Sequence, residues 1–462
     1  MVFNSVEFGI FLVSLLYLYF SVFRGDKQRD VLLLVASYIF YMAWYWTYAG
    51  LIFLSSIVDF FIGKKLYKEQ DQKRKKLFLF ASLATNLSLL GIFKYFNFFS
   101  DTTATIFSGL GFQVDVWHHE LLLPVGISFY TFQTLSYTLD IYRGKIKPEP
   151  KFIKFATYVA FFPQLVAGPI VRAADFLPQL NRKLAVTDKQ IQLGLSLICL
   201  GLIKKVCIAD TLALLAVDAA FENPQQFSSL DLLFSLYAYA FQIYCDFSGY
   251  SDIAIGVAML FGFKFPVNFN KPYLSASPSE FWTRWHISLS SWLRDYLYIS
   301  LGGNRGTSLM TYRNLFLTML LGGLWHGAAM NFILWGIFHG SILILYRLLK
   351  VSNATTTSGL FLQRFIFFHL VVFGWLLFRV TSMDNFLEYS ATLLSFSTGI
   401  SLSPLFFFIL LVASVSHFID FNRIQECVGR FPILLRSIAY TSVLLLVLSF
   451  SVEDAAFIYF QF

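Results

Sequence analysis

The sequence is poor in charged residues. Of its 462 residues, 13% are charged and 57% are hydrophobic, whereas ordinary soluble domains carry about 25% charged residues. This deficit excludes a soluble protein, and the mean hydropathy of +0.64 agrees. Because one spanning helix needs about 20 apolar residues, the sequence predicts an all-α polytopic membrane protein. It has room for roughly ten to twelve transmembrane helices plus re-entrant or interfacial helices.

Cysteine is scarce, and several chemical motifs are missing. The four cysteines, Cys199, Cys207, Cys245 and Cys427, show no metal-site spacing and no disulfide framework. We interpret them as small buried hydrophobic residues. No H-E-x-x-H motif, nucleophile elbow, P-loop or convincing dinucleotide fingerprint is present. No metal site is therefore predicted, and hydrolase and ATPase functions lack a motif.

The net charge of +8 is distributed between the apolar runs. No basic face on a soluble module is visible, so no nucleic-acid partner is expected. The loops near 24–29, 64–76 and 143–154 are basic and should be cytoplasmic, whereas the loop near 99–120 is acidic and should lie outside. The N-terminus is then extracytoplasmic. The residues before the first apolar run include only Glu7 as a charged side chain, so we expect a retained span and no cleaved signal peptide.

The middle of the chain is less regular. Residues 161–172 are apolar but broken by two prolines and a glycine, which predicts a re-entrant or interfacial piece. A long helix is expected at about 188–221 and another apolar segment at about 229–262. Residues 264–313 are polar and rich in Trp and Tyr, which suggests a surface-lying piece or a cytoplasmic funnel. We predict one membrane domain, 1–462, with N-terminal helices 1–155, a catalytic core 156–350 and C-terminal helices 360–462.

His326 is the most informative residue of the chain. It lies among Gly322, Gly323, Trp325 and Gly327 in a stretch apolar enough for a membrane. An imidazole at membrane depth is costly unless it is paired or functional, and a neutral imidazole can take a proton from an attacking hydroxyl. The glycines permit close approach of backbone or substrate, and Trp325 could exclude water. The alternative is a core histidine bonded to a neighbouring helix.

His286 is the second candidate catalytic residue, and it could bind substrate, orient an acyl donor or assist proton transfer. Asp295 would lie about 180° from it on a continuous helix, so the two would not form an orienting pair. The alternative is an interfacial histidine. The candidate residues for binding substrate or donor are Arg284, Trp285, Arg294, Asp295, Trp325 and Asn331.

The remaining histidines are weaker candidates. His339 would lie about 220° around a straight helix from His326, so the two share a face only if the chain breaks between them. His369 and His417 are expected to be structural, and His118 and His119 to be solvated in the outer loop.

Two carboxylates, Asp246 and Asp252, fall in an apolar segment six residues apart, so they would not stack as a helical pair. A buried Asp needs a partner, and Lys204 or Lys205 is a candidate. The alternative to a functional role is a structural polar cluster.

Several segments together resemble the membrane-bound O-acyltransferase (MBOAT) family, in particular its alginate O-acetyltransferase (AlgI-like) bacterial branch. The resemblance covers most of the chain. It rests on residues 123–133, 140–144, 162–170, 204–210, 246–256, the Trp285-His286 run and 324–327.

The resemblance implies a ring of helices around a central funnel, with His326 as the catalytic histidine and His286 as the second, upstream histidine. It also implies transfer of an acyl group, usually acetyl, from a cytoplasmic thioester donor such as acetyl-CoA to an extracytoplasmic polysaccharide, with no bound cofactor. A separate periplasmic SGNH-like acetyltransferase partner and a location in the bacterial inner membrane are implied as well. Two alternatives stay open: D-alanyl transfer to teichoic acid by the same fold, and a non-enzymatic acyl or glycan transporter.

Overall fold

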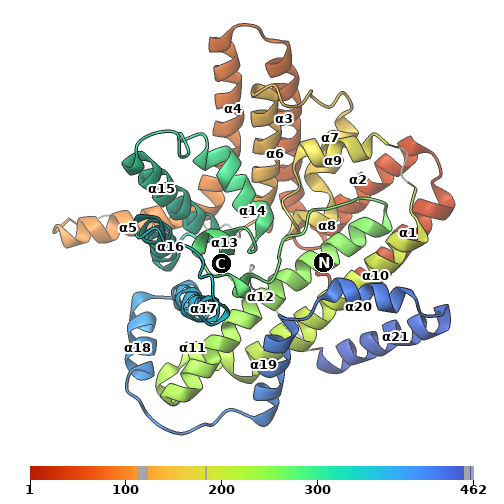
Figure 1. Ribbon diagram of the computed structural model, residues 1–462. Coiled ribbons are helices and arrows are strands. Elements are labelled where there is room, and N and C mark those ends of the chain that lie inside the picture. The colour runs from red at the N-terminus through yellow and green to blue at the C-terminus, as the bar shows by residue number, and fades with distance from the viewer. Residues whose placement is uncertain (113–115, 117–122, 183–184, 452–457, 459–462) are drawn as a thin grey trace. The chain divides into compact units, whose positions relative to one another are not determined.

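The structure, a computed structural model, describes residues 1–112, 116, 123–182, 185–451 and 458. Within these ranges all regular elements are helices (Figure 1), which confirms the predicted all-α class. Asp115, His118, His119 and Glu120, assigned above to the outer loop, lie outside the described residues.

Six of the described helical segments are long and apolar enough to cross a membrane, and two shorter apolar segments, Val6–Val22 and Pro404–Ser416, accompany them. The predicted ten to twelve spans exceed this number. One reason is that long helices such as Ser229–Leu260 and Ser308–His326 carry polar residues along their length, so they are less apolar than a lipid-facing span.

The chain divides into two compact units, one of residues 1–187 with 258–265 and one of residues 188–257 with 266–462. The predicted subdivision at 155 therefore falls inside the first unit, because the helices that follow it pack on the N-terminal ones. The first unit contains α1 (Val6–Tyr17), α2 (Asp26–Met42), α3 (Ala49–Lys68), α4 (Gln72–Leu90), α5 (Phe96–Gly109), α6 (Ile127–Tyr142), α7 (Phe152–Ala160), α8 (Phe162–Leu165) and α9 (Ala173–Leu180).

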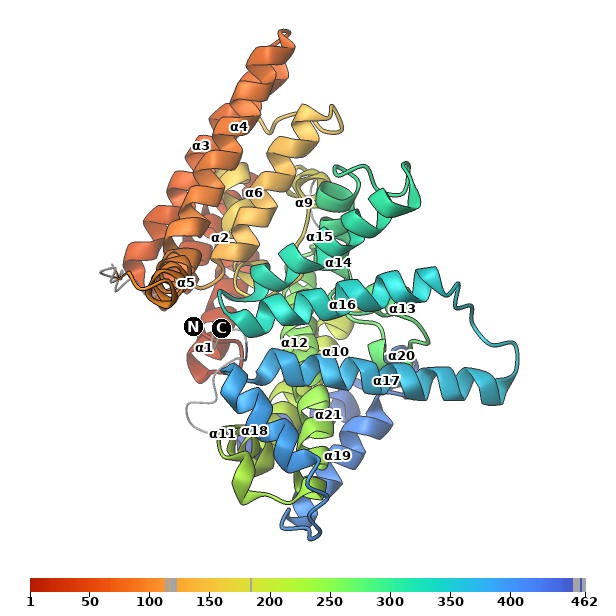
Figure 2. The same ribbon diagram turned by 90° about the vertical axis from the view of Figure 1, so that its left-hand side faces the viewer.

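Helices α3, α4 and α6 run side by side in both views (Figures 1 and 2). A fully buried polar network joins them. Asp59 on α3 accepts hydrogen bonds from Ser82 Oγ at 2.6 Å and from Asn86 Nδ2 at 2.8 Å, both on α4. Thr134 of α6 donates to the Asn86 amide oxygen at 3.1 Å. Each partner satisfies a group that would be costly to bury alone.

The segment 161–172 confirms the predicted break in regular backbone. Only the single turn α8 is helical before residue 173, although the whole stretch apart from Arg172 is buried. Non-helical backbone at membrane depth is tolerated where protein covers it, so this piece lies inside the unit.

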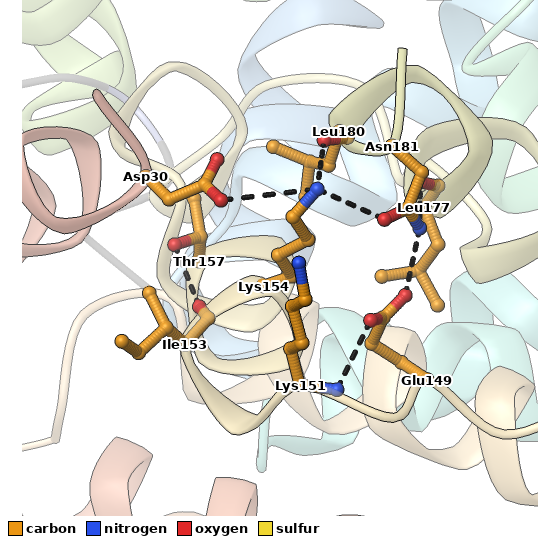
Figure 3. A network of polar contacts seen from close by, with 9 residues as sticks. All are labelled: Asp30, Glu149, Lys151, Ile153, Lys154, Thr157, Leu177, Leu180 and Asn181. Carbon is orange, nitrogen blue, oxygen red and sulfur yellow. Dashed lines mark hydrogen bonds and ion pairs between the residues drawn. The ribbon is translucent and has the colours of Figure 1, made fainter. Parts of the chain in front are cut away.

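Lys154 joins three parts of the first unit (Figure 3). Its ammonium group donates to the Leu180 carbonyl at 2.6 Å and to Asn181 Oδ1 at 2.9 Å, and it lies 3.8 Å from Asp30 Oδ2. Asn181 in turn donates to Glu149 Oε2 at 2.8 Å. Lys154 therefore satisfies the Leu180 carbonyl at the C-terminal end of α9 while linking α9 to α2 and α7.

The second unit contains α10 (Asp188–Leu202), α11 (Asp218–Glu222), α12 (Ser229–Leu260, its last three residues in the first unit), α13 (Pro278–Trp282), α14 (Ile287–Trp292), α15 (Ser308–His326), α16 (Met330–Leu348), α17 (Thr357–Arg379), α18 (Met383–Leu393), α19 (Pro404–Ser416), α20 (Phe421–Gly429) and α21 (Ile433–Phe450). The run from α10 to α11 is one helical segment, Asp188–Glu222, interrupted by π turns. It matches the predicted long helix.

Helices α10 and α12 meet through small residues and buried charge. A Cβ at Gly249 would lie 2.7 Å from the Gly201 carbonyl oxygen, so only glycine permits this approach. The two lysines that follow Gly201 in the sequence form ion pairs with the aspartates of α12. Lys204 lies 2.6 Å from Asp252 and Lys205 lies 2.7 Å from Asp246, so both lysines proposed as partners are confirmed.

Candidate active site

Helices α15 and α16 form a hairpin that breaks immediately after His326. α15 ends at His326, Gly327 is extended, and α16 begins at Met330. The two helices lie side by side (Figure 2). They approach closely at Gly323, where a Cβ would collide with the Phe332 carbonyl oxygen. The glycines around His326 therefore permit the two backbones to come together in the turn.

One face of α15 lines a cavity of about 380 Å³ in the second unit. The α15 residues that line the cavity are spaced as on a single helical face, and the last of them is the histidine. They are Leu315, Thr318, Met319, Gly322 and His326. α13, α14 and α16 supply other walls, including Trp282, Ile287 and Trp335. The volume is within the range of small-molecule sites.

The His326 imidazole is enclosed by three aromatic rings. The ring centres of Trp325, Trp335 and Phe378 lie 5.1, 5.1 and 5.2 Å from it, all edge to face. Only 6% of the residue is exposed. The side chain therefore borders the cavity while aromatic carbon surrounds it, which limits the access of bulk water.

Two arginines, Arg294 and Arg347, also line the cavity, and both are exposed. Arg294 pairs with Asp295 at 2.7 Å, and this hydrogen bond raises the pKa of the Arg294 guanidinium. Arg347 lies 12 residues after Trp335 on α16, about 18 Å along the helix axis. The cavity thus extends from a buried imidazole to an exposed, positively charged rim, with Ser290 and Ser291 also lining it.

His286 is fully buried between α13 and α14 and does not line this cavity. Its backbone is left-handed, with φ 41° and ψ 56°, a conformation uncommon outside glycine. Its ring lies edge to face against Phe247, with centres 4.5 Å apart, and its Nδ1 is 3.2 Å from Asn268 Oδ1. Trp325 contacts both histidines, since its ring centre is 6.1 Å from that of His286.

The other predicted binding residues lie elsewhere. Trp285 packs on Trp375 with ring centres 4.6 Å apart, and Arg284 pairs with Glu280 at 2.9 Å. Asn331 donates to carbonyl oxygens at the end of α17. None of Arg284, Trp285, Asp295, Trp325 and Asn331 is among the residues that line the cavity. Of the residues predicted to bind substrate or donor, only Arg294 lines the cavity that His326 also lines.

Sequence reasoning missed Trp282, Trp335, Arg347 and Asn268. The aromatic residues belong to patterns common to any buried helix, and no spacing rule joins Asn268 to His286 across 18 residues. The chain breaks between His326 and His339, at Gly327, but His339 does not line the cavity. It lies one turn beyond Trp335, with ring centres 4.7 Å apart. The Gly327 that follows His326 is a signal for a helix end.

His369 and His417 have structural hydrogen bonds. His369 lies 2.8 Å from the Tyr237 hydroxyl and 2.8 Å from the Phe365 carbonyl. His417 Nε2 accepts from the Tyr273 backbone N–H at 3.1 Å.

A helical membrane protein whose buried histidine borders a cavity of ligand size fits the class of intramembrane transferases. Residues 143–378 match the membrane-bound O-acyltransferase (MBOAT) family. The chain belongs to this family and is an O-acyltransferase of the bacterial multi-pass membrane type.

Its relatives include two kinds of O-acetyltransferase. The chain is 44% identical over 400 residues to the probable alginate O-acetylase AlgI of Pseudomonas aeruginosa, which covers 86% of this chain and 76% of that protein. It is 35% identical over 458 residues to the peptidoglycan O-acetyltransferase of Helicobacter pylori, covering 92% and 84%. A teichoic acid D-alanyltransferase of Bacillus subtilis is 30% identical over 285 residues, covering 56% and 69%.

Proposed function

We propose that the protein is a membrane O-acetyltransferase of a bacterial inner membrane. It takes acetyl groups from a cytoplasmic thioester, acetyl-CoA, for the O-acetylation of an extracytoplasmic polysaccharide. The observation that carries the proposal is the single cavity that joins buried His326 to the exposed arginines. We also propose the family arrangement of roughly ten to twelve membrane-spanning helices around a funnel.

The two arginines at the exposed end of the cavity favour a donor that carries several negative charges. Coenzyme A carries phosphate groups, and arginine guanidinium groups bind phosphate through charge-assisted hydrogen bonds. Arg294 and Arg347 border the cavity from η8 (Leu293–Tyr298) and from the last turn of α16. A donor bound by its phosphates at this rim could extend its thioester along the cavity toward His326.

His326 supplies the base for the transfer. Its neutral imidazole takes the proton of an acceptor hydroxyl as the hydroxyl oxygen attacks the thioester carbonyl carbon. The new C–O bond forms, the C–S bond breaks, and the departing thiolate takes a proton from the imidazolium. The enclosing rings of Trp325, Trp335 and Phe378 keep bulk water away from the reacting carbonyl, which favours transfer over hydrolysis.

A separate extracytoplasmic acetyltransferase of the SGNH type is proposed as the partner that completes modification of the glycan. The names of the relatives include both alginate and peptidoglycan, and both acceptors offer sugar hydroxyls. We therefore propose surface or wall polysaccharide in general as the acceptor.

The test is the O-acetyl content of isolated surface and wall glycans from wild-type, deletion and His326→Ala cells. We expect acetyl to disappear from one glycan in both mutants while the variant protein remains in the membrane. His369→Gln is the control, because His369 bonds Tyr237 and does not line the cavity. Unchanged acetyl in every fraction would refute the proposal, and a loss of alanine esters instead would show D-alanyl transfer.

A further inference from the structure

We infer that Asn268 is a positioning residue that holds His286 as the tautomer protonated on Nδ1, so that Nε2 acts as a proton acceptor. The inference rests on the proposed function for its catalytic meaning, because Trp325 packs against both His286 and the proposed base His326. Its structural basis is the Asn268 amide oxygen, which lies within hydrogen-bond distance of the Ser288 N–H, the Ser288 hydroxyl and His286 Nδ1.

The orientation of the Asn268 amide is fixed by its neighbour Ser288. The backbone N–H of Ser288 lies 3.1 Å from one amide atom of Asn268, and the Ser288 hydroxyl lies 2.8 Å from the same atom. A backbone N–H can only donate, so this atom is the oxygen, Oδ1. The Nδ2 group then faces the Ser251 hydroxyl at 3.2 Å, which can accept. The assignment thus satisfies both ends of the amide.

The proton on His286 follows from that orientation. Nδ1 of His286 lies 3.2 Å from Asn268 Oδ1, and an amide oxygen can only accept. Nδ1 must therefore carry the hydrogen. In the neutral imidazole the second nitrogen, Nε2, then has the lone pair. His286 can accept a proton or a hydrogen bond at Nε2, but while neutral it cannot donate one there to a developing oxyanion.

The backbone around Asn268 makes this arrangement rigid. The Asn268 carbonyl accepts from the Ile287 N–H at 2.9 Å, and the Asn270 N–H donates to the Arg284 carbonyl at 2.9 Å. These bonds join the segment before α13 to the segment that carries His286. Only 1% of Asn268 is exposed, and His286 is held in its left-handed conformation next to it. Hydrogen bonds of this kind hold a histidine ring in one orientation.

The first measurement is ¹⁵N NMR of the purified full-length protein with ¹⁵N-labelled histidine, with the His286 signals assigned by their loss in His286→Gln. We expect a protonated, pyrrole-type Nδ1 and an unprotonated, pyridine-type Nε2 in the wild type. In Asn268→Leu the proton should shift to Nε2 or distribute over both nitrogens. In Asn268→Asp, which keeps the acceptor oxygen, Nδ1 should stay protonated. Asn270→Ala is the control, because Asn270 is exposed in the same segment.

The second measurement is acetyl transfer. We expect kcat of Asn268→Leu to fall roughly tenfold to hundredfold, by analogy with the loss of the hydrogen bond that orients a metal-bound histidine, with KM for acetyl-CoA within about twofold. Asn268→Asp should retain more activity than Asn268→Leu. An Nε2-protonated wild type, or an unchanged tautomer in Asn268→Leu, would overturn the inference. If Asn268→Leu does not fold, the wild-type spectrum still decides the tautomer of His286. The positioning role of Asn268 is then tested by comparing kcat of Asn268→Asp with kcat of Asn270→Ala. Absence of acetyl transfer by the wild type, with the expected tautomer, would instead refute the proposed function.

Discussion

The imidazole of His326 lies edge to face against the indole of Trp335, with ring centres 5.1 Å apart and planes at 82°. These residues belong to different helices, and both line the same cavity. Trp335 also contacts His339 one turn further on. The Trp335 indole therefore contacts both imidazoles and forms part of the cavity wall beside His326.

Replacing Trp335 should change how well the site excludes water. Trp335→Ala removes the ring that covers one side of His326, so acetyl-CoA hydrolysis without acceptor should rise relative to transfer, while Trp335→Phe should keep most of the transfer rate. The measurement is release of free CoA with and without acceptor. Trp46→Ala is the control, since Trp46 is 73% exposed. Equal ratios of hydrolysis to transfer in all four proteins would exclude this role.

Reversing the charge at the cavity rim should weaken donor binding. Arg347→Glu is expected to raise KM for acetyl-CoA roughly fivefold, about 1 kcal/mol, because a partly exposed ion pair is worth no more. The kcat should change little, since Arg347 lies 12 residues along α16 from Trp335, the residue of that helix that contacts His326. The effect should diminish at high salt.

Lys350→Glu provides the matched control for Arg347. It makes the same change of sign from lysine at an exposed position three residues later, which does not line the cavity. An equal rise of KM in both variants would mean that general surface charge, and not the rim of the cavity, attracts the donor.

The sequence was sufficient for the helical class and the long helix from 188, and it named Lys204 or Lys205 as a candidate partner of the buried aspartates. Each of these depends on local composition or on the high cost of burying charge. The orientation of Asn331 shows the limit of such reasoning. Its amide serves the C-terminal carbonyls of α17, Phe378 and Val380. No pattern within residues 322–331 indicates that α17, which ends nearly fifty residues later, places its last carbonyl oxygens next to Asn331.

The candidate site shows the same division. His326 could be recognised because an imidazole in an apolar stretch is unusual. Arg284 and Arg294 each pair with a neighbouring carboxylate, but only Arg294 lines the cavity. Asn268 could not be recognised, since its role depends on hydrogen bonds between two irregular segments. Tertiary contacts, and not residue type, decide which polar groups in 264–313 face the cavity.

The α15–α16 hairpin should tolerate no side chain at Gly323. Gly323→Ala places a carbon against the Phe332 carbonyl oxygen and within 3.2 Å of the Gly336 backbone nitrogen. Backbone cannot move aside as a flexible side chain can, so the free energy of unfolding should fall by about 1–3 kcal/mol. We expect a lower Tm in detergent and a loss of transfer, because the hairpin positions His326.

Gly9→Ala is the corresponding control, since nothing lies within 4 Å of a Cβ at Gly9. Its Tm should equal or exceed that of the wild type, as alanine favours a helix more than glycine does. A Gly323→Ala protein with the same Tm as Gly9→Ala would show that the two helices can separate without cost.

The buried charges between the helical segment Asp188–Glu222 and α12 predict a non-additive effect of mutation. Lys205 lies 2.8 Å from Asp210 and 2.7 Å from Asp246, and all three are almost fully buried. Lys205→Met leaves two carboxylates without their shared cation, so stability should fall by about 3–5 kcal/mol. Lys264→Met, at an exposed position, should have no comparable effect.

Removing all three charges together should restore much of that loss. In Lys205→Met with Asp210→Asn and Asp246→Asn no unpaired charge remains, and a well-packed neutral replacement of a buried ion pair is often neutral or stabilising. The amide oxygen at 246 could still accept the Ile458 N–H, which now lies 2.8 Å from Asp246 Oδ2. The measurement is Tm of the single and triple variants in the same detergent. A triple variant less stable than Lys205→Met would mean that hydrogen bonding to the carboxylates, and not compensation of charge, is what the cluster contributes.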